Sequence, residues 1–340
     1  MNWTELEPKA SRIRETVLDL LDQVSAEQKR GAMPAPGAGF VKSREALRNP
    51  EVDVVVCGEV KRGKSTFINA LLGKELLPTG VRETTSQVFR VSHAVKESFA
   101  LVFEDGHREP ITAQQLARYG SQTTADQEGE PMFRGRNLRW IEVNTPAAFL
   151  PEGVHLVDTP GLGALYARHG EITHRYILKA DAVIFVLDSD QPMTQPEKAF
   201  LEKVHGITPN VLYIQTKIDM KDESAWQEIR TRNEKLLKEA FGGQAGAAPR
   251  VYPVASSLLF RAAAEKDEKE RGYLVEDSLF NEARTALEAT IYRSAGWTRS
   301  AWGAAEALRY VKGVLPALDE QRRMLKSESA AEQEGFRKAK

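Results

Sequence analysis

The middle of the chain alternates between nearly continuous apolar runs and stretches in which apolar residues have helical spacing. Runs of the first kind are typical of strands that are buried on both faces of a parallel sheet. They lie at residues 52–59, 154–160, 180–190, 211–217 and 251–256. Because helical patterns separate most of these runs, the sequence predicts a doubly wound α/β domain with a mostly parallel sheet.

The stretch between Arg90 and Pro151 has a different pattern. Its segments SFALVFEDG and LRWIEVNTP are strand-like, and the segment between them is polar and contains glycine. Strand-like segments outside the regular alternation indicate additions to the domain rather than further βαβ units. We therefore expect added strands and a long surface excursion in this part of the chain.

Both ends of the chain have helical patterns. Apolar residues recur at helical intervals from Thr4 to Gln28, and a linker rich in Gly, Ala and Pro follows at 31–39. The pattern is helical again from about Leu279, and Gly313 and Pro316 indicate a kink or break. Since neither end can bury its apolar stripe alone, we expect a helical bundle formed from both termini. The expected division is a helix with a linker at 1–45, the α/β domain at 46–272, and C-terminal helices that pack with the first helix at 273–340.

Composition limits the classes of function. With 340 residues, 41% of them hydrophobic, the chain can bury one large core or two modest ones. Its 47 Lys and Arg against 48 Asp and Glu give a net charge of -1, which provides no general attraction to nucleic acid or anionic lipid. The single cysteine, Cys57, excludes an internal disulfide framework and fits a reducing compartment. Its simplest role is that of a small buried strand residue.

The sequence shows no targeting or membrane-spanning pattern. The opening MNWTELEPKA has no basic start followed by an apolar block, and no run of about 18 apolar residues occurs. We therefore expect a cytoplasmic chain that is at most peripheral to the inner face of the cell membrane.

The segment Gly58-Glu59-Val60-Lys61-Arg62-Gly63-Lys64-Ser65 has the spacing of a phosphate loop. It follows a predicted strand and leads into a helical pattern that begins at Thr66, which is the context such a loop requires. The glycines allow backbone N–H groups to turn toward phosphates. Lys64 would neutralise the β and γ oxygens, and Ser65 would offer a hydroxyl to Mg²⁺. The segment, together with Thr66, is therefore the predicted nucleotide cradle.

Metal ligands are expected around the same phosphates. The run Asp158-Thr159-Pro160-Gly161 ends a later apolar strand, where Asp158 can hold Mg²⁺ through a water and Gly161 can donate its N–H to the γ-phosphate. A threonine between the cradle and Asp158 should coordinate the metal, and RETTSQV offers Thr84 and Thr85. We favour Thr85 because the strand-like VFRV follows it directly. The predicted metal set is Ser65, Thr85 and Asp158, the last through water.

The motif Thr216-Lys217-Ile218-Asp219 selects the base. The Asp219 carboxylate can accept hydrogen bonds from both the N1–H and the 2-amino group of guanine, a pattern that adenine does not offer. The stem of Lys217 can lie over the ring. The later run VASS places Ser256 near the guanine O6, with Ala255 and Ser257 beside it. These motifs predict GTP rather than ATP as the ligand.

Together these motifs resemble the GTPases of the dynamin superfamily, in particular bacterial dynamin-like proteins. The resemblance rests on GEVKRGKSTFINALLG, LPTGVRETTS, VDTPGLGAL, ADAVIFVLDSDQPMTQPEKAFL and TKID, within residues 45–260. It implies Mg²⁺-dependent hydrolysis of GTP to GDP, with K⁺ as a candidate monovalent cation. It also implies GTP-dependent homodimerisation through the G domains, and a hinge movement of the bundle that serves membrane remodelling or tethering. Residues 46–272 would be the GTPase domain, and nucleic acid is not an expected partner.

The phosphate loop departs from the family pattern at two positions. Val60 stands where eukaryotic dynamins carry a glutamine that helps to orient the attacking water, which valine cannot do. Lys61 stands where some relatives carry an arginine that acts as an internal finger, so it is a candidate for that charge. The alternative is a solvent-facing lysine, since Lys lacks the bidentate fork of Arg. The predicted catalytic set is Lys61, Lys64, Ser65 and Thr85. Arg62 and Arg82 are candidate charges on a dimer face.

The length of the chain and the alternative functions are related to the family pattern. Family members continue into a stalk with a lipid-binding tip, so we expect either a piece of a longer protein or a compact member, with lipid contact only through parts not evident in this sequence. The alternative function is a slow regulatory GTP switch that controls affinity for a protein partner. An ATP-driven machine is opposed by Asp219. The residues His155, His169 and His174 lack the spacing of metal ligands.

Overall fold

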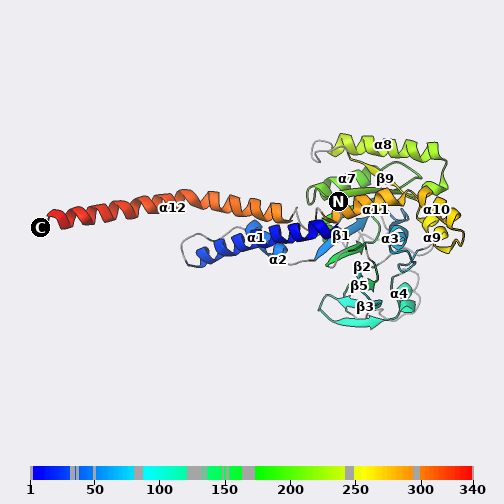
Figure 1. Ribbon diagram of the computed structural model, residues 1–340, viewed down its shortest axis with the longest axis horizontal. Coiled ribbons are helices and arrows are strands. Elements are labelled where there is room, and N and C mark those ends of the chain that lie inside the picture. Colours follow the sequence, from blue (N-terminus) through cyan, green and yellow to red (C-terminus); the bar gives the residue numbers. More distant parts are fainter. Residues whose placement is uncertain are drawn as a thin grey trace. The chain divides into compact units, whose positions relative to one another are not determined.

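The computed structural model divides into two compact units. It describes residues 3–30, 35, 38–48, 51–79, 87–120, 133, 136–147, 149–150, 153–162, 173–241, 249–292, 294 and 299–338. One unit comprises Glu51–Ser294, and the other comprises Met1–Pro50 with Ala295–Lys340 (Figure 1). Most of the linker expected at 31–39 lies outside the described residues.

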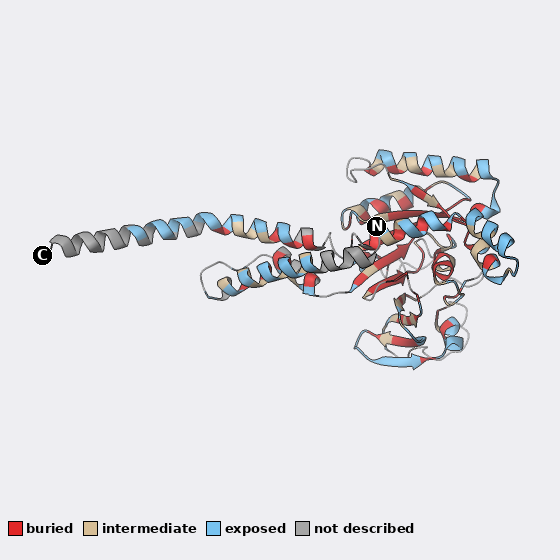
Figure 2. Ribbon diagram, viewed as in Figure 1, coloured by how far each residue is buried: buried red, intermediate tan, exposed pale blue. Residues whose placement is uncertain are grey.

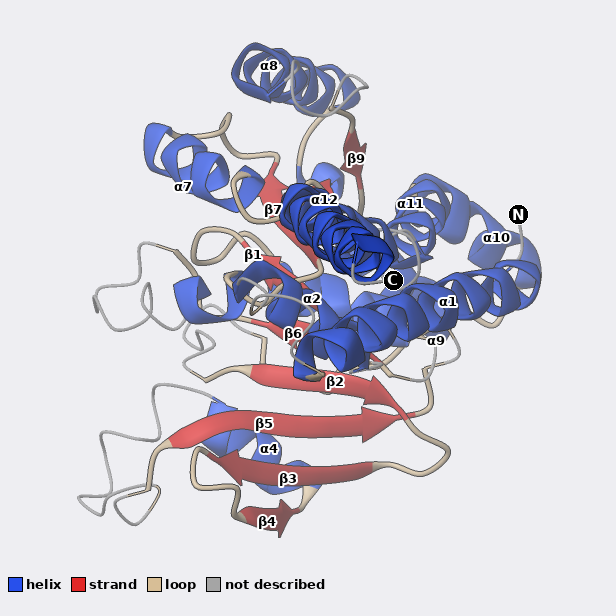
Figure 3. Cartoon of the chain, turned by 90° about the vertical axis from the view of Figure 1, so that its left-hand side faces the viewer, coloured by secondary structure: helices blue, strands red, loops and turns tan. Residues whose placement is uncertain are grey.

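The described strands of the larger unit form one nine-stranded sheet with the order β4-β3-β5-β2-β6-β1-β7-β8-β9 (Figure 3). The half from β6 to β9 is parallel: Val54 of β1 is in register with Leu156 of β6 and with Ala182 of β7. These five strands are the five apolar runs of the sequence, and β7 is buried along its whole length. Figure 2 shows much of the sheet in the colour of buried residues. Their bounds are β1 Val52–Cys57, β6 Val154–Asp158, β7 Ala182–Asp188, β8 Val211–Thr216 and β9 Val251–Pro253.

The other half of the sheet is mixed. Strand β2 runs antiparallel to β6 but parallel to β5, and β3 is antiparallel to both β5 and β4. The added strands expected between Arg90 and Pro151 are therefore confirmed. Their bounds are β2 Phe89–His93, β3 Ser98–Phe103, β4 Arg108–Ile111 and β5 Leu138–Thr145, with helix α4 at Ala113–Gly120.

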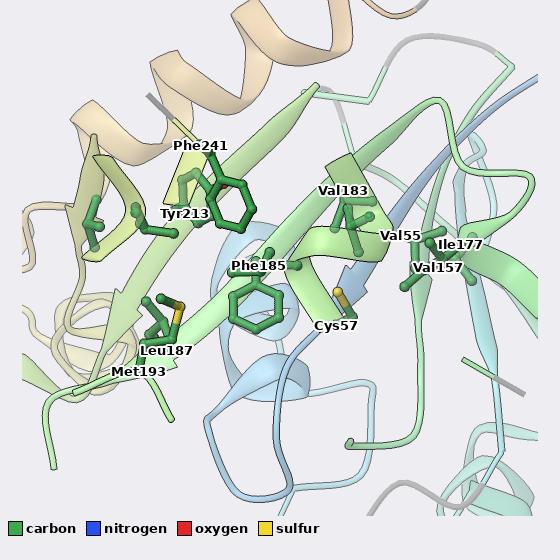
Figure 4. Packing of buried hydrophobic residues seen from close by; sticks show 14 of the residues in the cluster. Val55, Cys57, Val157, Ile177, Val183, Phe185, Leu187, Met193, Tyr213 and Phe241 are labelled. Atoms are coloured by element: carbon green, nitrogen blue, oxygen red, sulfur yellow. The ribbon is translucent and has the colours of Figure 1, made fainter. Parts of the chain in front are cut away.

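Helices cover both faces of the parallel half, as the doubly wound prediction requires. On one face, Val183, Phe185 and Leu187 of β7 pack with apolar residues of α7 and α8 in one buried cluster, part of which Figure 4 shows. On the other face, α11 contacts β8 and β9. The ring of Phe280 in α11 lies 5.3 Å from that of Phe67 in α3, centroid to centroid. The bounds are α3 Lys64–Leu72, α7 Gln195–His205, α8 Glu223–Phe241, α9 Ser256–Ala264, α10 Glu268–Asp277 and α11 Phe280–Tyr292, with a 3-10 turn, η1, at Ile218–Met220.

The smaller unit is a helical bundle built from both termini, as expected. It contains α1 (Trp3–Lys29), α2 (Ala38–Arg48) and α12 (Arg299–Lys338). Val17 and Leu21 of α1 pack with Phe40 and Leu47 of α2, and Tyr310 of α12 lies against them. No helix among the described residues combines the length and the apolarity needed to cross a bilayer.

Two expectations for the C-terminal region differ from the structure. A kink or break was expected at Gly313 and Pro316, and the break is wrong, because α12 continues through both residues to Lys338. The proline removes the donor that the carbonyl of Lys312 would use, but Lys312 is exposed and water can replace the lost donor. Helix α11 belongs to the larger unit, so this unit ends at Ser294 rather than at residue 272.

Candidate nucleotide site

The phosphate loop, residues 58–65, connects β1 to α3 through two glycines whose backbone conformations would strain any other residue. Gly58 has a φ of 147°, and a Cβ there would lie 2.3 Å from the carbonyl oxygen of Val186. Gly63 has a φ of 86° and is the N-cap of α3. Only glycine adopts these conformations without strain and allows so close an approach. The backbone is thus held in a tight turn that leads into a helix N-terminus, where unpaired N–H groups favour an anion.

Lys64 is buried and bent over the loop that precedes it. Its ammonium Nζ lies 3.0 Å from the carbonyl oxygen of Glu59 and 3.3 Å from that of Gly58. Burial lowers the pKa of this ammonium, while the neighbouring Asp158 carboxylate acts in the opposite direction. A buried cation that rests only on carbonyl oxygens would gain from an anionic partner such as a phosphate.

Ser65 and Asp158 form a pair that suits a hard cation. The Ser65 hydroxyl donates to Oδ2 of Asp158 at 2.6 Å. Asp158 is fully buried, and its Oδ1 has no hydrogen-bond partner among the described residues. Burial raises the pKa of this carboxyl to about 6, against the lowering effects of Lys64 and Ser65. A buried carboxylate with an unpaired oxygen beside a hydroxyl is a set of oxygen donors that Mg²⁺ accepts, usually with waters and phosphate oxygens.

The loop after β6, residues 158–162, is fixed directly on the phosphate loop. Leu162 donates its N–H to the Gly58 carbonyl at 3.0 Å and forms a parallel bridge with Glu59. A Cβ on Gly161 would lie 2.6 Å from the backbone nitrogen of Val60. The two loops are therefore in van der Waals contact at a position where only glycine fits.

The base-reading loop, residues 216–219, is fixed on the other side of the phosphate loop. The Thr216 hydroxyl lies 2.6 Å from the carbonyl oxygen of Arg62. Lys217 has a left-handed φ of 62°, and its Nζ donates to Asp188 at 3.0 Å and to Asp190 at 3.2 Å. Asp219 accepts a hydrogen bond from the Ser257 hydroxyl.

The VASS segment lies at the start of α9, beside this loop. Ser256 is the first residue of the helix, and Ala255 is its N-cap. The Ser256 hydroxyl is buried without a partner among the described residues, while Ser257 contacts Asp219. The segment therefore offers one buried hydroxyl, that of Ser256, which has no partner among the described residues, near the carboxylate that we expect to read guanine.

The structure corrects one prediction and leaves others outside its range. Arg62 is wrong as a dimer-face charge, because its side chain is 2% exposed and paired with Asp188 and Glu197. Lys61 is exposed and has a left-handed φ of 64°. Thr84, Thr85 and Arg82 lie outside the described residues, as does His169.

Sequence analysis missed Asp188 and Glu197, which surround the buried guanidinium. Asp188 ends β7, and Glu197 closes a capping box with Thr194 at the start of α7. The capping box was a readable signal, since Thr and Glu stand three residues apart before a helical pattern. Of the histidines, His155 donates to or accepts from Ser92 through Nδ1 at 2.6 Å. The described residues contain no group of three His, Cys, Asp or Glu that could hold a metal.

Comparison with known proteins gives a family. Residues 54–218 match the Dynamin family. The isoniazid-induced protein IniA of Mycobacterium tuberculosis is 30% identical over 267 residues, which cover 78% of this chain and 40% of that protein. The bacterial dynamin-like protein of Nostoc punctiforme is 30% identical over 200 residues, which cover 55% of this chain and 28% of that protein.

A solved structure shares the fold. It is an oligomerised bacterial dynamin pair that provides a mechanism for the long-range sensing and tethering of membranes. The TM-score is 0.54 at 18% identity, over 95% of this chain and 59% of that one. The chain spans less than half the length of the two curated relatives named above. The family match and the relatives therefore place residues 54–218 of the chain in the Dynamin family, and the solved structure agrees with them in fold.

Proposed function

We propose that the chain binds GTP at the phosphate loop and hydrolyses it with Mg²⁺, and that two copies activate each other through their G domains. One observation supports this most strongly: the loops that follow β6 and β8 each make a direct contact with the loop that follows β1. Ser65 bonds Asp158, and Thr216 bonds the Arg62 carbonyl. Ligands of open α/β sheets bind at the carboxyl ends of the strands, where these loops lie.

The side chains have distinct roles in this proposal. The Lys64 ammonium exchanges the carbonyl oxygens of the loop for the β and γ phosphate oxygens, which are stronger acceptors. Gly161 donates its N–H to the γ-phosphate, and Asp219 accepts from guanine while the Ser257 hydroxyl holds its carboxylate. Ser65 and Thr85, with Asp158 through a water, would hold Mg²⁺, which would neutralise phosphate charge during transfer. Positioning and charge stabilisation are then sufficient, and no side chain needs to act as a general base.

Lys61 supplies positive charge in the same proposal. It is exposed, and its left-handed backbone is a costly conformation for a residue with a side chain. An exposed cation at the rim of the cradle is available to a transition state completed by a second copy. Lys61→Ala should lower the turnover number without weakening GDP binding. Unchanged turnover would remove Lys61 from the catalytic set.

The relatives support a proposal for the cellular role. The full protein that carries this domain would couple the hydrolysis cycle to a hinge between its two units and use the movement to remodel or tether membranes. K⁺ is a candidate second cation. Lipid contact would come from parts that are not evident in this sequence.

Turnover as a function of protein concentration tests the proposal. GTP hydrolysis per molecule is measured at fixed Mg²⁺ and K⁺ as the chain is concentrated, with Lys64→Ala as the inactive control. Rising specific activity supports mutual activation of G domains. A flat, slow rate favours the regulatory switch, and no hydrolysis above the Lys64→Ala control refutes the proposed enzyme.

Base recognition has its own test. Asp219→Asn should exchange a preference for guanine nucleotides for one toward xanthine nucleotides, because the amide offers a donor to the 2-oxo group. An Asp219→Asn protein that keeps its GTP preference would show that Asp219 does not read the base.

A further inference from the structure

One residue of the phosphate loop is a buried arginine. The Arg62 side chain is 2% exposed, and its guanidinium pairs with Asp188 at the end of β7 and with Glu197 in the first turn of α7. The distance from Nη2 to Oε2 of Glu197 is 3.1 Å. Glu59, in the loop itself, lies 3.7 Å away. A charge buried in this way is stable only while it is paired, so the positions of the loop and of these carboxylates depend on one another.

Asp188 joins this arginine to the base-reading loop. Its Oδ1 accepts from Arg62, and its Oδ2 accepts from Lys217 Nζ at 3.0 Å. The Asp188 side chain is 7% exposed, so one carboxylate shielded from solvent holds both cations. The Thr216 hydroxyl repeats the connection through the Arg62 carbonyl at 2.6 Å. Two short paths thus connect the same two loops.

We propose that Asp188 is a positioning residue for base recognition. Asp188 is held by Arg62 and in turn holds Lys217, so it fixes the position of the loop that carries Asp219. The inference rests on the proposed function, because it takes Asp219 as the residue that reads guanine. It follows that a change at Arg62 alters the discrimination between bases although the buried guanidinium reads no base. A purely structural ion pair would change only the fraction of folded protein, and a ratio of two dissociation constants does not depend on that fraction.

The dissociation constants of GDP and IDP provide this ratio. Hypoxanthine lacks the 2-amino group of guanine but keeps the N1–H, so the IDP-to-GDP ratio reports the hydrogen bond that the 2-amino group is expected to donate to Asp219. Both constants are measured by displacement of a fluorescent GDP analogue from the wild type and from Arg62→Lys. Lysine keeps the charge but lacks the fork that bridges Asp188 and Glu197. We expect the ratio to fall by about fivefold in Arg62→Lys.

Repeating the Arg62→Lys comparison in two other variants tests whether the effect passes through Asp188. In an Asp188→Asn background the ratio should already be low, and Arg62→Lys should not lower it further, because the connection is broken. Asp190→Asn is the matched control: Asp190 contacts Lys217 at 3.2 Å and Lys221 at 3.4 Å, and its ion pairs among the described residues do not include Arg62. In that background Arg62→Lys should keep its full effect.

Each result decides between the two proposals. A wild type that binds neither nucleotide refutes the proposed function and the coupling with it. A wild type that prefers GDP, with a ratio that Arg62→Lys leaves unchanged or lowers equally in the Asp188→Asn background, refutes the coupling alone. If Asp188→Asn does not fold, the double-mutant cycle of Arg62→Lys with Lys217→Met takes its place. Additive effects on the ratio in that cycle would also overturn the coupling, and a departure from additivity would support it.

Discussion

Replacing Thr216 with valine removes one buried hydroxyl and almost preserves the shape of the side chain. Thr216 is 2% exposed, and its Oγ1 lies 2.6 Å from the carbonyl oxygen of Arg62 and 3.1 Å from that of Leu187. The hydroxyl has a single proton, and the shorter contact is the stronger hydrogen bond. The substitution therefore cuts the backbone connection between the base-reading loop and the phosphate loop.

The magnitude follows from what is left unpaired. A buried carbonyl that loses its donor costs about 1–3 kcal/mol, so Thr216→Val should lower the free energy of unfolding by about 2 kcal/mol. Thr216→Ser keeps the hydroxyl and loses one buried methyl group, which costs about 1 kcal/mol. The hydrogen bond is thus expected to outweigh packing, and valine should be the more damaging replacement.

Guanidinium unfolding of the three proteins measures this order. The midpoints should fall from wild type to Thr216→Ser to Thr216→Val with an unchanged slope, which shows that stability rather than compactness has changed. The dissociation constant of GDP should rise in the same order. A Thr216→Val protein as stable as the wild type, or more stable than Thr216→Ser, would refute the view that this hydroxyl holds the two loops together.

Three other predictions use groups near the sheet. Gly161→Ala places a Cβ 2.6 Å from the backbone nitrogen of Val60, so it should push the loop after β6 away from the phosphate loop. GTP turnover should then fall at least about tenfold, and a thermal unfolding curve of the same protein shows whether the fold persists. Cys57 is fully buried and burial raises the pKa of its thiol, so it should react with a maleimide only after denaturation; labelling of the native protein would contradict this. Burial lowers the pKa of His155 in the folded protein. As the pH drops below about 6.5, this histidine therefore binds a proton in the unfolded chain before it does so in the folded protein, and the melting temperature should fall. His155→Gln should reduce this dependence, and an unchanged pH profile would exclude His155 as its source.

The parts of the fold that could be predicted depend on local signals. The run from Val52 to Cys57 is apolar at nearly every position, and the phosphate loop that follows it has fixed spacing, so strand, loop and helix could be predicted together. Break signals were less reliable. Pro316 lies in an exposed helix, where water can replace the lost hydrogen bond, and the chain has no reason to end the helix there.

Membership of a unit depends on which distant partner a helix meets. Helix α11 has the same kind of apolar stripe as the bundle helices, with Ala283, Leu287 and Ile291 all buried. Its stripe packs on β8 and β9, which precede it by tens of residues, rather than on α1. The spacing of apolar residues in a helix predicts which face is buried, but it does not predict which other element packs against that face.

The ion pairs of Arg62 show how far contacts between distant residues could be predicted from the sequence. Its neighbours Lys61, Gly63 and Lys64 make a polar run, which is typical of an exposed loop, and the carboxylates that bury it lie 126 and 135 residues later. The order of the strands supplies the missing step. Because β7 lies next to β1 and runs parallel to it, the residue that ends β7 must lie beside the loop that follows β1. An aspartate at that strand end would therefore face any cation in the loop, and Asp188 follows from the topology once the order is known. The order itself results from packing between distant segments, and no local pattern contains it.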